Sequence, residues 1–376
     1  MEMMFNIPAK IYLAQGVSKQ IGELISDEGK KKVLLICDRN IVKAGLTEAV
    51  VESLESASIE TAVFDKVDGE PSYGTIEEAV AMARIEKADA VVGMGGGSAL
   101  DTAKCTVIME ANQHIVRYAD TFDEVEVKGM MLTLIPTTFG TGSEVTDGAV
   151  FSIPEENRKA TVWGRNTGVD LALIDPELAL GLPPSITAST GMDALAHAVE
   201  AYTSPMATYM SDMMAEKAIN LILEYLPACV EDGENIENRE KMCLASLLAG
   251  IAFNNGGLNQ GHELAHGLGA KFHIPHGVAC SLSLPLAIKA NAEYIPGRIE
   301  QLAKMFGVSD EEDKSDAIVG KLTELRKTLK IPGLHELGID EEMFEQVGDA
   351  WDAEPKGIYP FEPDREYIID FIRSIY

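Results

Sequence analysis

Hydrophobic residues in the first half of the chain form short runs, and stretches with helical spacing separate these runs. The runs are rich in β-branched residues and cover 32–37 (KVLLIC), 61–64, 90–93 and 131–135 (MLTLI). The intervening stretches, in which apolar positions recur every three or four residues, cover 41–54, 75–85 and 99–110. This alternation predicts parallel strands joined by helices, with helices on both faces of one sheet.

The second half of the chain has a different pattern. From about Pro184 onward apolar residues recur at helical spacing, in 185–202, 210–226, 239–254, 277–290 and 298–305. This pattern predicts an all-helical region. The double proline of LGLPP at 180–184 interrupts regular structure between the halves. A chain of 376 residues is long enough for two cores. We therefore expect an α/β domain over 1–182 and an all-α domain over 183–376.

The charge of the chain restricts its partners. Its 31 basic and 60 acidic residues give a formal net charge of −29, which disfavours binding to nucleic acid or to an anionic membrane surface. An anionic ligand must therefore be held by a local device, such as a helix N-terminus or a backbone nest. Five scattered cysteines, the absence of a signal-like N-terminus and the absence of a long apolar stretch lead us to expect a cytoplasmic protein with reduced thiols.

A glycine-rich segment follows one of the predicted strands. In VVGMGGGSALDTAK, at 91–104, the strand leads into Gly95, Gly96 and Gly97, and a helix is expected to begin at Ser98. Glycines allow close approach of a pyrophosphate, and the helix start supplies free N–H groups with a positive dipole end. The segment therefore predicts a phosphate-binding turn. The alternative is a tight turn with a serine cap, because isolated glycine loops are weak evidence.

Two further features extend this nucleotide-site hypothesis. The segment PTTFGTGSE at 136–144 directly follows another strand and carries Thr137, Thr138 and Thr141. Asp38 ends the first of the predicted strands, where an acid accepts hydrogen bonds from ribose hydroxyls and repels a 2′-phosphate. NAD is thus favoured over NADP. Asp38 as a simple turn or cap residue is an equal alternative, because in the common fingerprint the glycines precede the acid.

Candidate metal-binding residues occur in the helical half. Asp193 and His197 are four residues apart in GMDALAHAVEAY and project from one helix face. The segment GHELAHGLGAKFHIPHG at 261–277 carries four of the seven histidines, at His262, His266, His273 and His276. Imidazoles together with a carboxylate predict a mixed nitrogen and oxygen site that suits Fe²⁺ or Zn²⁺.

The same segment contains HELAH, which matches the HExxH motif of zinc proteases with Glu263 as general base. That hypothesis leaves the pair Asp193 and His197 without a role, and it does not account for the glycine-rich turns of the first half. A third possibility is a non-catalytic dinucleotide-binding protein whose histidines are structural. Three assays distinguish these hypotheses. A dehydrogenase oxidises NADH with an aldehyde, a protease cleaves peptides, and a non-catalytic protein binds the cofactor without turnover.

Taken together, GGGSALDTAK, PTTFGTGSEVT, LPPSITASTGMDALAHAVEAY and IPHG resemble the iron-containing (group III) alcohol dehydrogenases, in the same order and over essentially the whole chain. The resemblance implies a Rossmann-like parallel sheet followed by a helical domain, as in the dehydroquinate synthase-like fold. It implies reversible hydride transfer between NAD(H) and a small primary alcohol or aldehyde, with Fe²⁺ or Zn²⁺ as the metal. It also implies a homo-oligomer, at least a dimer.

The resemblance selects individual residues. The implied metal ligands are Asp193, His197, His262 and His276. His266 then lies off the metal, beside the nicotinamide, as a candidate for proton relay. Phe253 is placed in the substrate pocket, although a core aromatic is nearly as good an explanation. The residues implied around the cofactor are Asp38, Gly95, Gly96, Gly97, Ser98, Asp101, Thr137, Thr138, Thr141 and Lys159.

The chain departs from the family pattern at three places. It reads Glu70-Pro71-Ser72 near where the family often has an Asn–Pro pair, which puts the adenine-side contact in question. Gly148 replaces a residue that is commonly larger, and Gly267 replaces a frequent proline. We expect these two glycines to leave the substrate pocket roomier or more mobile.

Overall fold

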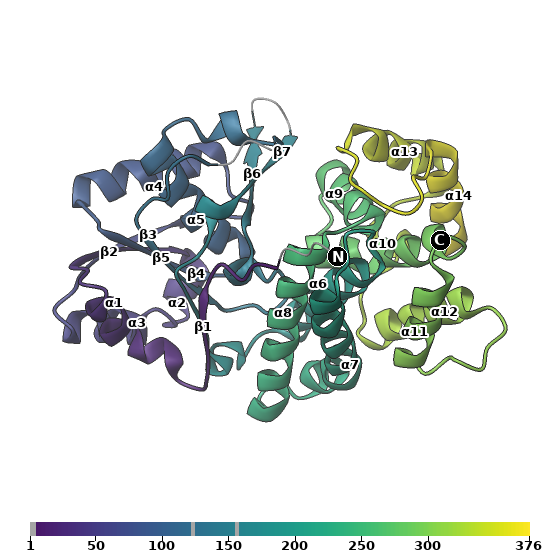
Figure 1. The fold of residues 1–376 in the computed structure, drawn as a ribbon, viewed down its shortest axis with the longest axis horizontal. Helices are drawn as coiled ribbons and strands as arrows, with labels where there is room; N and C mark the ends of the chain where they lie inside the picture. The colour runs from purple at the N-terminus through teal and green to yellow at the C-terminus, as the bar shows by residue number, and fades with distance from the viewer. Residues whose placement is uncertain (1–4, 122–124, 155–157) are drawn as a thin grey trace. The chain divides into compact units, whose positions relative to one another are not determined.

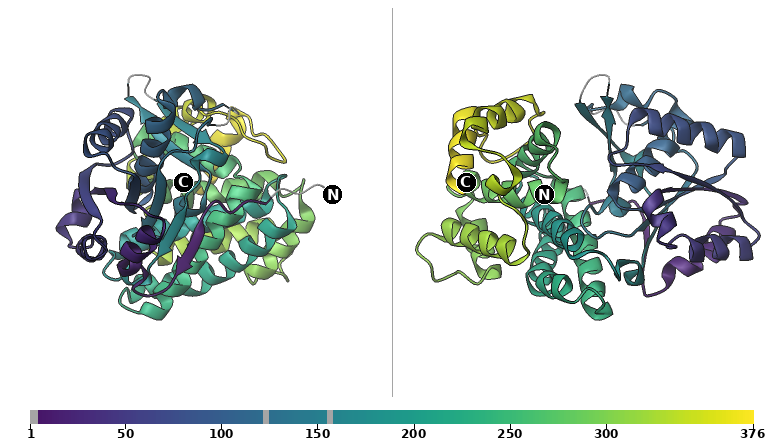
Figure 2. Two further views of the ribbon diagram at one scale, coloured as in Figure 1. Left: turned by 60° about the vertical axis from the view of Figure 1, so that its left-hand side comes forward. Right: turned by 180° about the vertical axis from the view of Figure 1, so that it is seen from behind.

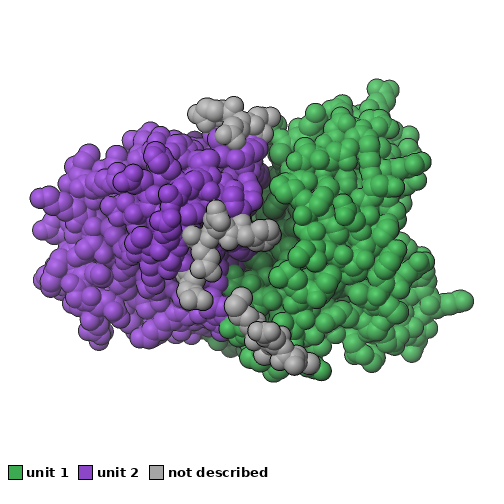
Figure 3. All heavy atoms as spheres, turned by 45° about the horizontal axis from the view of Figure 1, so that its top comes forward, with its two compact units in different colours: residues 1–5, 182–376 green, residues 6–181 purple. Residues whose placement is uncertain are grey.

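The computed structural model of the protein describes residues 5–121, 125–154 and 158–376. The chain divides into two compact units, Asn6–Gly181 and Leu182–Tyr376, which are drawn in different colours in Figure 3. The first unit is α/β and the second is helical. No helix in the described ranges is long and apolar enough to cross a membrane.

A six-stranded parallel sheet forms the centre of the α/β unit, in the order β1-β8-β5-β4-β2-β3. Its strands are β1 (Lys10–Leu13), β2 (Lys32–Asp38), β3 (Glu60–Val67), β4 (Ala90–Gly95), β5 (Met131–Pro136) and β8 (Leu171–Ile174). Every residue of β4 and β5 is buried, because both faces of a parallel sheet are covered. This is the parallel sheet that the apolar runs predicted.

Helices cover the two faces of this sheet (Figure 1). Val33 and Leu35 pack with α1 (Ile21–Asp27) and α3 (Glu48–Ser56), whereas Leu34 and Ile36 pack with α4 (Tyr73–Glu86) and α5 (Gly97–Asn112). Adjacent side chains of a strand point to opposite faces, which explains this division.

Two features of the α/β unit were not predicted. An antiparallel hairpin of β6 (Gly148–Ile153) and β7 (Arg158–Trp163) packs on α4 and α5. The stretch expected as one helix over 41–54 is broken into α2 (Arg39–Lys43) and α3, because Gly45 between them adopts φ +74°.

The helical unit consists mainly of nine α-helices among the described residues. They are α6 (Pro184–Thr203), α7 (Tyr209–Glu231), α8 (Ile236–Gly256), α9 (Gln260–Phe272), α10 (His276–Asn291), α11 (Pro296–Met305), α12 (Lys314–Thr328), α13 (Phe344–Ala353) and α14 (Arg365–Ile375). Near the C-terminus α13 and α14 pack on each other (Figures 1 and 2). The helical spacing from Pro184 onward is thus confirmed as helix.

The helix α6 is central to this unit and is buried throughout its second half. Small residues let its neighbours approach closely. A Cβ atom added to Gly277, at the start of α10, would lie only 2.1 Å from the carbonyl oxygen of Ser189 on α6. Glycine at this position brings the first turn of α10 against α6, which positions the histidine that begins α10.

Candidate metal and nucleotide site

Three helices bring the four predicted metal ligands together. Asp193 and His197 lie on α6, His262 lies on α9, and His276 is the first residue of α10. The Oδ1 atom of Asp193 is 3.7 Å from Nε2 of His197, 3.6 Å from Nε2 of His262 and 3.5 Å from Nε2 of His276. Three imidazole nitrogens therefore converge on one carboxylate oxygen.

This cluster fits a divalent metal ion. Asp193 Oδ1 is buried and, within the described parts of the chain, accepts no hydrogen bond. Burial raises the pKa of Asp193, but His197, His276 and His262 together lower it well below its ordinary value, so that the carboxylate stays ionised. One carboxylate oxygen and three imidazole nitrogens are donors that Fe²⁺ and Zn²⁺ both accept.

A buried glutamate that the sequence analysis missed orients one of these histidines. Glu200 lies on α6, one turn beyond His197, and its Oε1 atom is 2.7 Å from Nδ1 of His262. Its Oε2 atom accepts hydrogen bonds from the backbone N–H groups of Asn259 (2.9 Å) and His262 (3.1 Å). A carboxylate oxygen accepts, so Nδ1 of His262 donates its hydrogen to Glu200 and the opposite ring nitrogen, Nε2, faces Asp193. Gly261 leaves space for this carboxylate, because a Cβ there would lie 2.6 Å from Glu200 Oε1.

His266 and Phe253 lie at the edges of the histidine cluster. The Phe253 ring stacks on His197 with a centroid distance of 4.3 Å and an interplanar angle of 25°. The half-buried His266 stacks on His276 at 5.4 Å and meets His262 edge-on at 6.2 Å. His273, by contrast, is exposed at the C-terminal end of α9, where it adopts φ +55°.

Glu263 does not take part in the histidine cluster. Its carboxylate accepts hydrogen bonds from the hydroxyl of Tyr359 (2.6 Å) and from the backbone N–H of Gly357 (2.5 Å). Burial raises the pKa of Glu263 to about 7, against the lowering effect of these two bonds. The carboxylate is thus engaged with the C-terminal segment, which does not favour its use as the general base of a protease.

Cys280 is a second residue of the cluster that the sequence analysis missed. It lies one turn after His276 on α10, and its Sγ atom is 3.6 Å from Nε2 of His276 and 3.7 Å from Nε2 of His262. Burial raises the pKa of the Cys280 thiol to about 12. Cys280 follows His276 by four residues, and this spacing on one helix could have identified it, because residues four apart lie on the same face.

The glycine-rich turn and the threonine-rich segment meet at the carboxyl ends of β4 and β5. A Cβ atom on Gly97 would lie 2.7 Å from Cγ2 of Thr141, and one on Gly96 would lie 3.2 Å from Oγ1 of Thr138. The backbone N–H of Thr137 donates to the carbonyl of Gly95 at 2.9 Å. The carboxyl edge of a parallel sheet is where α/β proteins bind ligands.

The helix α5 begins at Gly97, one residue earlier than expected. Gly96 is its N-cap, and no side chain caps the first turn. The serine-cap alternative for Ser98 is therefore wrong, since Ser98 lies inside the helix. An uncapped helix start with three glycines leaves backbone N–H groups available to an anion.

Asp38 lies beside this turn because β2 and β4 are neighbours in the sheet. A Cβ atom on Gly95 would lie 3.7 Å from Oδ2 of Asp38, while Oδ1 accepts from the backbone N–H groups of Asn40 (2.7 Å) and Ile41 (3.1 Å). Asp38 thus caps α2 with one oxygen. The strand order brings it to the glycine turn despite their separation in sequence.

Buried charges connect α5 to the segment that follows β5. Asp101 accepts from the hydroxyl of Ser143 (2.5 Å) and from the backbone N–H of Val150 (3.0 Å). One turn on, the fully buried Lys104 donates to Thr146 O (3.0 Å), Thr146 Oγ1 (3.0 Å) and Gly148 O (2.7 Å). These bonds tie α5 to the end of the threonine-rich segment at Ser143 and to the residues that follow it.

The structure also accounts for the departures near the nucleotide site. Lys159 pairs with Glu70 at 2.5 Å, and Ser72 caps α4 by accepting from Thr75 N. At Gly148 the ring of Trp163 occupies the space that a side chain would take, because a Cβ there would lie 2.6 Å from it, and the effect of this glycine on the substrate pocket stays a prediction.

Gly267 likewise leaves no free space in the helical unit. A Cβ at Gly267 would lie 3.0 Å from the carbonyl oxygen of Ala350, so this glycine allows close packing of α9 against α13.

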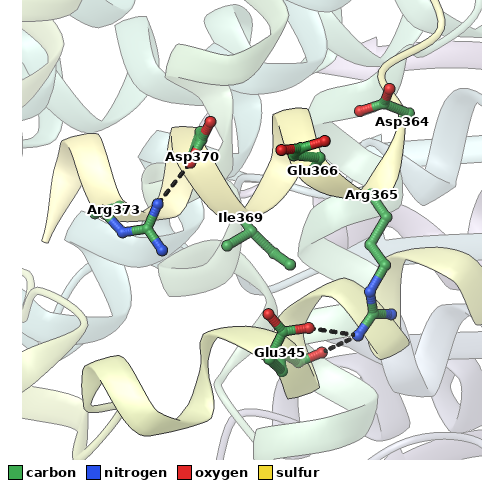
Figure 4. A pocket seen from close by; sticks show the side chains of 7 residues that line it. All are labelled: Glu345, Asp364, Arg365, Glu366, Ile369, Asp370 and Arg373. Carbon is green, nitrogen blue, oxygen red and sulfur yellow. Dashed lines mark hydrogen bonds and ion pairs between the residues drawn. The ribbon is translucent and has the colours of Figure 1, made fainter.

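A surface hollow of about 560 Å³ lies at α13 and α14, and none of the predicted metal or cofactor residues lines it (Figure 4). Both of its arginines form ion pairs within it, Arg365 with Glu345 and Arg373 with Asp370. No histidine lines it, so the hollow offers no metal-binding group of the kind described above.

Comparison with known proteins identifies the family. The sequence model of the iron-containing alcohol dehydrogenases matches residues 8–176, and that of the C-terminal region of the Fe-containing alcohol dehydrogenase family matches residues 187–376. The chain is 35% identical over 347 residues to an NAD-dependent methanol dehydrogenase of Bacillus methanolicus, covering 91% of each chain. It is 33% identical over 376 residues to alcohol dehydrogenase 4 of Saccharomyces cerevisiae, covering 99% of this chain and 98% of the yeast protein.

Solved structures give the same result. An alcohol dehydrogenase from Oenococcus oeni superposes with a TM-score of 0.94 at 31% identity, with full coverage of both chains. A 1,3-propanediol oxidoreductase superposes with a TM-score of 0.93, also at 31% identity and full coverage. The parallel sheet, the helical second unit and the histidine cluster with its buried acid agree with these matches. The chain belongs to the iron-containing alcohol dehydrogenase family and is an oxidoreductase of that family.

Proposed function

We propose that the protein oxidises small primary alcohols and reduces the corresponding aldehydes, with a divalent metal held by Asp193, His197, His262 and His276. The observation that carries this assignment is the buried Oδ1 atom of Asp193, which lies 3.5–3.7 Å from three imidazole nitrogens and accepts no hydrogen bond among the described residues. A divalent metal ion is a partner that suits this set of one carboxylate oxygen and three imidazole nitrogens.

The proposed chemistry separates the work of the metal from that of the side chains. A metal ion held by these four residues would supply Lewis acidity toward the substrate oxygen, and a nicotinamide cofactor would supply or accept the hydride. Glu200 holds Nδ1 of His262 in a hydrogen bond, so that the opposite ring nitrogen, Nε2, is the atom that would bind the metal. His266, half-buried beside His276, is the candidate proton relay, and Phe253 forms an apolar wall against His197.

The nucleotide is proposed to bind in the α/β unit. The backbone of Gly95, Gly96 and Gly97 and the uncapped start of α5 suit a pyrophosphate. Oδ2 of Asp38, beside Gly95, suits the adenosine ribose and favours NADH over NADPH. We assign the remaining cofactor contacts to Ser98, Thr137, Thr138, Thr141 and Lys159, with Asp101 fixing the threonine-rich segment. In this assignment residues 1–182 bind the dinucleotide and residues 183–376 hold the metal and the substrate.

The names of the relatives suggest the class of substrate. They include a methanol dehydrogenase of Bacillus methanolicus and a 1-propanol dehydrogenase of Salmonella typhimurium, the latter 36% identical over 329 residues. We therefore propose short unbranched alcohols and aldehydes as substrates. We further propose that the protein is cytoplasmic and forms a homo-oligomer, at least a dimer. Light scattering of the purified protein tests the oligomeric state directly.

The metal assignment is tested with a matched pair of histidine variants. Apoprotein loaded anaerobically with Fe²⁺ or Zn²⁺ should oxidise NADH in the presence of short aldehydes, and a chelator should abolish the reaction. His276→Ala should lose bound metal and turnover while it keeps its circular dichroism spectrum. His273→Ala, which changes an exposed histidine outside the cluster, should keep both. Full metal occupancy and unchanged turnover in His276→Ala would exclude His276 from the site.

A further inference from the structure

A sulfur atom lies within the proposed metal centre. Asp193, His262, His276 and Cys280 each offer one ligand atom, and these four atoms all lie within 4.8 Å of one another. Cys280 is buried, with 1% of its surface exposed. Its Sγ atom faces the Nε2 atoms of both histidines, which are the same atoms that face Asp193.

Four of the six distances between these atoms match the edges of a tetrahedral coordination shell, and all six are within 4.8 Å. Two donors about 2.1 Å from an ion are about 3.4 Å apart at the tetrahedral angle, and an imidazole nitrogen and a thiolate sulfur, about 2.1 and 2.3 Å from it, are about 3.6 Å apart. Asp193 Oδ1 lies 3.5–3.6 Å from the Nε2 atoms of His276 and His262. Cys280 Sγ lies 3.6–3.7 Å from the same two nitrogens.

His197 occupies the position of a second possible fourth donor. Its Nε2 atom is 3.7 Å from Asp193 Oδ1, and its ring stacks on that of His262 with a centroid distance of 4.6 Å. Asp193, His262 and His276 are thus common to two sets of four donors. One set is completed by an imidazole, and the other is completed by a thiolate.

We propose that Cys280 is an alternative fourth ligand that lets the centre bind zinc-like ions through sulfur, whereas Fe²⁺ is held with His197. The inference rests on the proposed metal site. Thiolate favours Zn²⁺ over the harder ions that carboxylates and water suit. Binding forms one metal–sulfur bond and releases the thiol proton to solvent, with no change of oxidation state. Cys280 therefore makes the metal selectivity of this chain depend on a side chain outside the four proposed ligands.

Cobalt(II) provides a direct probe, because a thiolate bound to Co²⁺ gives a sulfur-to-metal charge-transfer band in the near ultraviolet. Full-length apoprotein titrated with Co²⁺ should show this band at one equivalent. Cys280→Ala should bind Co²⁺ without the band, and His197→Ala should keep both. Cys105→Ala changes a fully buried cysteine of the α/β unit and is the matched control, so its band should be unchanged.

The affinities give a second measurement. In competition with a chromophoric chelator, Cys280→Ala should bind Zn²⁺ about 10–100-fold more weakly, whereas its affinity for Fe²⁺ should change by less than about threefold. Stoichiometric Co²⁺ binding without a sulfur band in the parent protein would overturn the role of Cys280 and leave the proposed metal centre intact. Failure of the parent to bind Co²⁺ stoichiometrically would overturn both. A band that persists in Cys280→Ala would also overturn the proposal.

Discussion

Replacing Glu200 by glutamine should weaken metal binding, although Glu200 is not itself a proposed ligand. The carboxylate accepts three N–H groups, from the His262 ring and from the backbone of Asn259 and His262. Glutamine keeps the shape of the side chain, but only one of its two terminal atoms accepts hydrogen bonds. The variant therefore cannot reproduce all three bonds.

Either orientation of the new amide has a cost. If its oxygen faces the two backbone N–H groups, its NH₂ group faces His262 Nδ1, and the ring hydrogen moves to Nε2, where it blocks the metal. If its oxygen faces Nδ1, the NH₂ group meets two buried backbone donors, at about 1–3 kcal/mol for each bond lost. Changes to such supporting groups typically lower metal affinity about 10–100-fold, or about 1.4–2.7 kcal/mol.

The measurement is the dissociation constant for Zn²⁺ and for Fe²⁺, determined by competition with a chelator and accompanied by circular dichroism. Glu263→Gln is a matched control, because it makes the same change one residue after His262 on a side chain that points to Tyr359. It should retain metal and most of the NADH-linked turnover. Unchanged metal affinity in a folded Glu200→Gln protein would refute the reasoning. Peptide cleavage by the parent that stops in Glu263→Gln would instead support the protease hypothesis.

Three further predictions concern other buried or charged groups. Lys104→Met should lower the free energy of unfolding by about 2–5 kcal/mol and raise the KM for NADH, because it removes the bonds from Lys104 to the carbonyls of Thr146 and Gly148, which follow the threonine-rich segment; a loss under about 1 kcal/mol in urea unfolding would contradict this. Burial raises the pKa of Glu263 to about 7, so folding favours its protonated form and its contribution to stability should fall as the pH rises from about 4.5 to about 7. Glu263→Gln should therefore flatten the slope of the free energy of unfolding against pH in that window, and an unchanged slope would count against the shift. The parent should prefer NADH, and Asp38→Gly should narrow the ratio of kcat/KM for NADH over NADPH; a parent that already prefers NADPH would show that Asp38 is misassigned.

Features determined by neighbouring residues could be predicted from the sequence. The apolar runs identified β2, β4 and β5, because a strand buried on both faces has a continuous apolar pattern, and a short apolar run also identified the edge strand β3. The pairing of Asp193 with His197 followed from their spacing on one helix. The four-residue strands β1 and β8 were not recognised, because so short a segment carries little periodic signal, and the β6–β7 hairpin was missed as well.

Tertiary structure decided which side chains share a site and which way each of them points. The motif HELAH is compatible with two enzymes, and packing distinguishes them by turning Glu263 toward Tyr359. Glu200 and Cys280 join the histidines only because α6, α9 and α10 pack closely, with glycine at the points of contact. Local spacing fixes the direction of a side chain relative to its own helix. The position of that helix among its neighbours depends on contacts between residues far apart in the chain, and no short motif contains that information.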